Sequence, residues 1–121
     1  MLFSTQKTKW ITPEIAGNGV KDKDGEYIQK PVEFEICLLN TEEAEKLLAD
    51  IDSKAIDGVG IYMKYTKNVR NCETETGEIT DPKEFAKLPG THEYVLSVTK
   101  IIMQYGLYGD ALKNVSRRST H

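Results

Sequence analysis

The stretch between Thr91 and Asn114 constrains the fold of this chain more than any other segment, because it has the most regular apolar period. Apolar residues recur at i, i+4, i+7, i+8 and i+11, at positions Tyr94, Val98, Ile101, Ile102 and Tyr105. This spacing places one apolar stripe along a helix of about four turns. Thr91 is expected to cap it, its hydroxyl accepting from the free N–H groups of the first turn. We predict a helix over residues 91–106, with a short continuation to residue 114.

The end of this helical region carries more apolar surface than a core of this size requires. The central residues of the stripe are expected to face the core. Tyr105, Leu107 and Tyr108 are harder to bury together, and we expect them to form a docking surface.

A strand and a second helix are predicted from residues 31 to 52. In the segment PVEFEICLL, residues 31–39, apolar and mostly charged positions alternate with period two, which is typical of a half-buried strand. Asn40 and Glu43 then have capping-box spacing before apolar residues at i, i+3, i+4 and i+7. This pattern predicts an amphipathic helix over residues 41–52.

The segment 56–72 matches two patterns. Val59, Ile61, Met63 and Tyr65 alternate as in a strand, whereas Ile61, Tyr65, Val69 and Cys72 have helical spacing. We favour a helix over residues 60–71. Residues 73–81 are expected to form a polar loop with a turn at Thr76-Gly77, and Asp81-Pro82 is typical of a helix start, which predicts a short helix over residues 82–88.

The fold class predicted from these elements is an α-rich α+β fold. Asp24-Gly25 is a tight-turn signal that joins residues 19–21 and 26–29 in a hairpin. Short N-terminal strands are thus followed by about four helices, at residues 41–52, 60–71, 82–88 and 91–106. We expect one globular domain over residues 1–114 and a disordered tail over residues 115–121.

Composition excludes several classes of protein. The net charge is −3 and no basic block is present, which argues against a nucleic-acid-binding surface. No apolar run reaches the roughly 20 residues that span a bilayer, and the N-terminus lacks the apolar region of a signal peptide, so we expect a cytoplasmic protein without membrane contacts.

No motif for catalysis or for a cofactor is recognised. Cys37 and Cys72 lie far apart with only His92 and His121 as further soft ligands, which predicts two free thiols and no metal site. The chain has no nucleophile elbow, phosphate-binding loop or metalloprotease motif. Paired carboxylates such as Glu33 and Glu35 fall on faces expected to be solvated. We therefore predict a non-enzyme without cofactors.

The order of motifs along nearly the whole chain resembles that of the tail assembly chaperones of long-tailed bacteriophages. A polar N-terminal segment containing Trp10 precedes the strand PVEFEICLL and the helix beginning NTEE. A middle segment ends YTKNVRN, and a loop with TDPKEFAKLPG leads to a last apolar helix that closes on ALKN.

This resemblance implies a small, mostly helical chaperone in the host cytoplasm that is absent from the mature virion. Such proteins bind the long, apolar tape measure protein during tail morphogenesis and keep it soluble. We expect self-association as well. The residues predicted to contact a partner are mostly tyrosines, which tolerate both exposure and burial: Tyr62, Tyr65, Tyr94, Ile101, Tyr105, Leu107 and Tyr108.

The resemblance also implies a second, longer form of the protein made by ribosomal slippage. Leu112-Lys113-Asn114 is compatible with a slippery codon string, which reading the gene there tests. Two other functions stay open. One is a structural tail or head–tail connector subunit that persists in the virion and forms rings by head-to-tail contacts. The other is a small enzyme or regulatory binder, for which the sequence offers no positive feature.

Overall fold

A computed structural model of the chain describes residues 5–108. Within this range it contains seven strands and four α-helices. In chain order they are β1 (Thr8–Ile11), β2 (Val20–Lys21), β3 (Tyr27–Gln29), β4 (Glu33–Cys37), α1 (Thr41–Asp52), α2 (Gly58–Tyr65), β5 (Thr66–Arg70), β6 (Cys72–Thr74), β7 (Gly77–Ile79), α3 (Pro82–Ala86) and α4 (His92–Met103), followed by a π-helical turn, Gln104–Tyr108.

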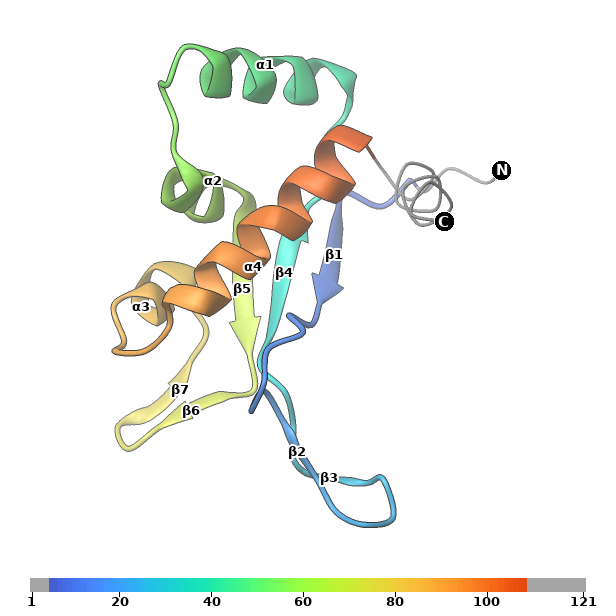
Figure 1. Cartoon of the computed structure of the whole chain (residues 1–121), viewed down its shortest axis with the longest axis vertical. Helices are drawn as coiled ribbons and strands as arrows, with labels where there is room; N and C mark the ends of the chain where they lie inside the picture. The colour runs from blue at the N-terminus through green and yellow to red at the C-terminus, as the bar shows by residue number, and fades with distance from the viewer. Residues whose placement is uncertain (1–4, 109–121) are drawn as a thin grey trace.

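The centre of the molecule is an antiparallel sheet with strand order β1-β4-β5. Helix α4 crosses one face of this sheet diagonally, as Figure 1 shows. Helix α1 lies beyond one end of the sheet, whereas the β2–β3 hairpin projects from the opposite end. The β6–β7 hairpin and α3 lie on the β5 side of the sheet.

The core lies between the sheet and α4, and aromatic rings connect its layers. Phe34 is fully buried, and it faces α4 together with Ile11 and Val69, its partners on the neighbouring strands. Its ring makes edge contacts with Phe85 of α3 at 5.0 Å and with Tyr62 of α2 at 6.2 Å between centroids. Edge-to-face pairs are favourable beyond the area they bury, so Phe34 joins the sheet to two helices.

The prediction of an α-rich fold is wrong, because three stretches expected to be helical, polar or undefined form strands. These are β1, β5 and the β6–β7 hairpin. Residues 73–81 do contain the predicted turn, where Gly77 has a φ of +125°, but the flanking residues pair across it. Among the strand residues of this hairpin, only Cys72 and Ile79, which pair with each other, are large and apolar. The sequence therefore lacks the apolar–polar alternation that indicates a strand.

The predicted helix over residues 60–71 is half helix and half strand. Helix α2 starts two residues earlier because the Asp57 carboxylate accepts from the Gly60 N–H at 2.7 Å, and the helix ends at Tyr65. Strand β5 then begins at Thr66. Val69 is buried at the position that helical spacing predicts, but it reaches the core as a strand residue opposite Phe34.

The elements predicted from the strongest local signals are confirmed. The capping box of α1 is present, with the Glu43 N–H donating to Asn40 at 2.8 Å and the Asn40 N–H to Glu43 at 3.1 Å. Asp81 caps α3 with Pro82 in its first turn. The predicted N-terminal hairpin is β2–β3, and β4 is the predicted half-buried strand, with Phe34 and Ile36 fully buried.

The predicted cap of the last helix is wrong in its chemistry. Thr91 is the residue before α4, but its hydroxyl donates to the Leu88 carbonyl at 2.8 Å and caps no N–H of the first turn. The helix itself ends at Met103 and continues as the π-helical turn through Gly106, where an added Cβ would lie 2.9 Å from the Leu39 side chain. The predicted continuation is π-helical as far as Tyr108, and its remainder to residue 114 and the predicted tail, residues 115–121, lie outside the described residues.

Candidate partner-binding groove

Tyr62 and Tyr65 do not form a partner surface, so this part of the predicted contact set is wrong. Both lie on the face of α2 that packs into the core, with Tyr62 fully buried and Tyr65 only 6% exposed. The Tyr62 hydroxyl donates to the Pro82 carbonyl at 2.7 Å, which satisfies its polar tip inside the protein. The burial of this phenol raises its pKa well above the ordinary value.

Tyr62→Phe is expected to lower the free energy of unfolding by about 1 to 2 kcal/mol, because it removes a buried hydrogen bond and leaves the Pro82 carbonyl without its partner. Urea unfolding of the wild type and the variant measures this difference. Tyr27→Phe is the matched control, since Tyr27 is half exposed on the β2–β3 hairpin and its hydroxyl has no comparable partner within residues 5–108. Equal losses in the two variants would contradict the assignment.

The other predicted contact residues lie along α4 and the turn after it. Tyr94 is half-buried and its ring packs on Phe85 at 5.6 Å, which makes it the edge of the core. Ile101, Tyr105 and Leu107 are partly buried at the other end of the helix. The side chain of Tyr108 lies outside the described part of the structure.

Ile101 and Tyr105 line a groove between α4 and β1, which we call the β1–α4 groove. Its volume is about 550 Å³. Ser97, Lys100 and Gln104 complete the helical wall, and residues 9–12 with Glu14 form the opposite wall. The two walls come from segments almost ninety residues apart in the chain, so the helical pattern alone reveals only one of them.

The charges of the groove are mainly positive. The Lys9 ammonium lies 4.3 Å from the centre of the Tyr105 ring, a cation–π contact, and Lys100 lies on the helical wall. Glu14 is the one acidic residue among those that line the groove. Ile11 and Ile101 give the groove apolar lining, and with the two lysines that also line it they suit a segment that is apolar and acidic.

The second face of the central sheet carries a hydrogen-bonded polar network. Glu35 accepts from Thr8 of β1 and from Asn68 of β5, both at 2.8 Å. Glu33 accepts from the Arg70 guanidinium at 2.9 Å, and that guanidinium also stacks on the Trp10 ring at 4.1 Å. Each glutamate of β4 therefore accepts hydrogen bonds from both sides, from β1 or the residue after it and from β5. These bonds explain why the two glutamates lie on a solvated face.

The carboxyl group of Glu35 is expected to titrate below its ordinary value. The Asn68 amide lowers its pKa most, and the Thr8 hydroxyl lowers it further by donating to the ionised form. Because the pKa is depressed in the folded state, the resulting stability is present above about pH 4.5 and is lost as pH falls through the folded pKa. A carboxyl-detected NMR titration measures it. Asn68→Ala should move the midpoint upward, and a wild-type midpoint at or above the ordinary value would contradict the network.

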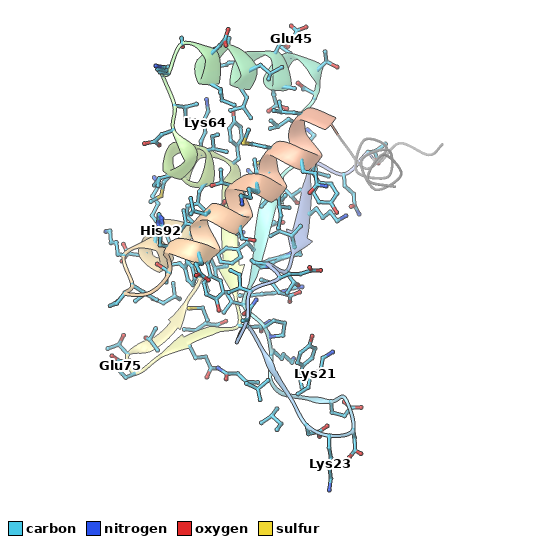
Figure 2. The ribbon with its side chains drawn as sticks, viewed as in Figure 1. Lys21, Lys23, Glu45, Lys64, Glu75 and His92 are labelled. Atoms are coloured by element: carbon cyan, nitrogen blue, oxygen red, sulfur yellow. The ribbon has the colours of Figure 1, made fainter. Side chains whose placement is uncertain are left out.

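Among the residues described, no three His, Cys, Asp or Glu side chains gather as metal ligands would. Cys37 and Cys72 are free, and burial raises the pKa of both thiols. His92 is exposed at the start of α4 (Figure 2). The helices between residues 5 and 108 are all too short or too polar to cross a membrane.

Comparison of the chain with protein-family models, with curated proteins and with solved structures found no match.

Proposed function

We propose that this protein binds an apolar segment of another polypeptide in the β1–α4 groove and keeps it soluble, as a tail assembly chaperone of a long-tailed bacteriophage. The observation that carries this proposal is the groove itself. Two of the residues predicted as partner contacts, Ile101 and Tyr105, line it together with Ile11 of a distant strand. A concave, partly apolar site of about 550 Å³ is of the size that receives a few side chains of a partner.

The client in this proposal is the tape measure protein. A long amphipathic chain exposes apolar stripes that associate with one another before the tail tube forms. A protein that covers such a stripe with an aliphatic and aromatic groove prevents this association. The proposal makes the protein a binding protein of the host cytoplasm, not an enzyme, and one that leaves before the virion is complete.

Coexpression with the large protein encoded directly downstream tests the function. The proposal expects the two proteins to copurify and the soluble yield of the large protein to rise with the amount of the small one. A variant with a charge in the groove, described in the Discussion, separates binding at this site from a general effect on expression. If the large protein neither copurifies nor gains solubility, the chaperone function is rejected.

A structural tail or connector subunit is the second candidate, and one feature of the fold favours it. The β2–β3 hairpin projects from the body, with Lys23 at its tip (Figure 2), and it exposes Ile28 by 71% and Tyr27 by 50%. Tube subunits are usually rich in strands, and the seven strands between residues 5 and 108 are compatible with such a fold. Projecting arms with apolar side chains suit head-to-tail contacts between copies. Mass spectrometry of purified virions decides: structural stoichiometry supports this candidate, and absence supports the chaperone.

A further inference from the structure

Within residues 5–108, strand β1 forms one outer edge of the central sheet, and its outward backbone groups have no hydrogen-bond partner there. The Leu38 N–H donates to the Lys7 carbonyl at 2.8 Å, and these residues continue the β1–β4 register. Hydrogen-bonded pairs alternate along an antiparallel ladder. Lys9 and Ile11 therefore turn their backbone groups toward β4, while Thr8 and Trp10 turn theirs toward the outer edge. Within residues 5–108, neither Thr8 nor Trp10 has a backbone partner on that edge.

The opposite edge of the sheet differs from this one. There the Val69 N–H of β5 donates to the Thr80 carbonyl at 3.0 Å, so the segment after β7 partly covers the edge. The open β1 edge also borders the β1–α4 groove. Lys9 and Ile11 face α4, and the wall of the groove extends to Trp10 and Thr12, whose side chains turn to the other face. A strand added beside β1 would place alternate side chains in the groove.

From these features we infer that β1 accepts a fourth strand from the client, an extended segment with an acidic residue two positions from an aliphatic one. The acidic side chain would lie beside Lys9 and within reach of Lys100, and the aliphatic one beside Ile11 and Ile101. The backbone of the segment would pair with the free N–H and carbonyl groups of Thr8 and Trp10. This inference rests on the proposed function for the identity of the client, and it adds the conformation in which the client is held.

Charge favours this occupant over the other two that the chain itself offers. Residues 109–121 carry three basic residues, Lys113, Arg117 and Arg118, and one acidic residue, Asp110, so they match the lysines of the groove poorly. A second copy paired about Lys9 would place two ammonium groups opposite each other, which is destabilising. Lysine on an open edge is a common protection against such self-pairing. An acidic partner removes this repulsion and replaces it with attraction.

The direct test is amide hydrogen exchange of the full chain, measured by NMR with a short synthetic peptide. In the probe peptide, every second residue is threonine, and the positions between the threonines hold valine, glutamate and valine in that order. In the matched control peptide, lysine replaces the glutamate. We expect the Thr8 and Trp10 amides to exchange fast in the free protein and Lys9 and Ile11 to be protected. Saturating probe peptide should slow Thr8 and Trp10 by at least about tenfold, and the control peptide should not.

Proline at position 8 tests the backbone pairing specifically. Thr8→Pro removes an outward N–H and leaves the β1–β4 ladder intact. Proline is tolerated at such a position, where the N–H faces away from the sheet. Thr8→Val is its matched control, because it also loses the hydroxyl that donates to Glu35 but keeps the N–H. We expect Thr8→Pro to weaken probe binding by at least about tenfold relative to Thr8→Val. If Thr8→Pro does not fold, Lys9→Glu replaces it, and this variant should prefer the lysine peptide over the glutamate peptide.

Three results would overturn the inference. The first is unchanged exchange at Thr8 and Trp10 with saturating probe. The second is protection of these amides that rises with protein concentration in the absence of peptide, which assigns the edge to a second copy. The third is equal binding of both peptides. Coexpression separates this inference from the proposed function. A client solubilised equally by Thr8→Pro and Thr8→Val keeps the chaperone and rejects strand addition, whereas peptide binding without client solubilisation keeps the strand-accepting edge and rejects the client.

Discussion

Ile101→Asp is expected to weaken binding of the tape measure protein by about 2 kcal/mol or more, which is roughly thirtyfold in Kd. Ile101 is one of the apolar side chains that line the β1–α4 groove. Binding of the client would bury a carboxylate at this position. It would have no partner there, because the acidic side chain of the client already pairs with the lysines of the groove. Copurification and soluble yield of the coexpressed client measure the loss.

Leu96→Asp is the matched control for this variant. Leu96 lies on the same helix and is 40% exposed, but it does not line the groove. The Leu96→Asp variant introduces the same charge into α4 and should leave client binding unchanged. Because Ile101 also packs against the core, Ser97→Trp serves as a second variant that fills the groove without removing a core side chain. Equal client yields for Ile101→Asp and Leu96→Asp, with no effect of Ser97→Trp, would exclude the groove as the binding site.

Phe34→Ala is expected to lower the free energy of unfolding by about 3 to 5 kcal/mol, the range for deletion of a fully buried phenylalanine. Phe34 has no exposed surface, and its ring contacts Phe85 and Tyr62 while its neighbours in the sheet are Ile11 and Val69. A domain has about 5 to 15 kcal/mol of stability in total, so the loss leaves little or nothing. Urea unfolding measures it, with folding checked by circular dichroism.

Ile28→Ala provides the control for the core variant. Ile28 is 71% exposed on the projecting hairpin, and its truncation should change the unfolding free energy by less than about 0.5 kcal/mol. A loss below about 1 kcal/mol in Phe34→Ala would contradict the packing of the sheet against α2 and α3 through this ring.

Local signals predicted the elements whose structure is determined by nearby residues. The capping box at Asn40 and Glu43 fixes the start of α1, and the Asp81-Pro82 pair fixes the start of α3. The alternation in β4 is equally local, since one face is apolar and the other charged. These elements carry their own start signals or period, so they were recognised without knowledge of their partners.

The strands that the sequence concealed depend on partners far along the chain. Strand β5, with the sequence TKNVR, has a single large apolar side chain, Val69, and forms because β4 pairs with it and buries that side chain against Phe34. Strand β1 pairs with β4 across more than twenty residues. Strand formation responds to pairing and burial more than to intrinsic preference, so short polar strands are missed.

Only part of the candidate site could be predicted, because local patterns do not show which distant segments come together. The helical stripe indicated Ile101 and Tyr105, which line the groove, but it gave no information on the opposite wall from β1. Tyrosine tolerates exposure, which is why the sequence favours a surface position for Tyr62 and Tyr65. The Pro82 carbonyl, which accepts from the Tyr62 hydroxyl, comes from a distant helix and allows that residue to be fully buried.

Site-specific photocrosslinking tests the central claim, that the β1–α4 groove holds another polypeptide, most directly. A photoreactive phenylalanine analogue is placed at Tyr105 in the groove, and in a matched protein at Leu48, which is 49% exposed on α1 and outside the groove. After irradiation of cells that coexpress the downstream protein, we predict an adduct of the two chains from position 105 and none from position 48. Adducts of equal yield from both positions, or from position 48 alone, would contradict the claim.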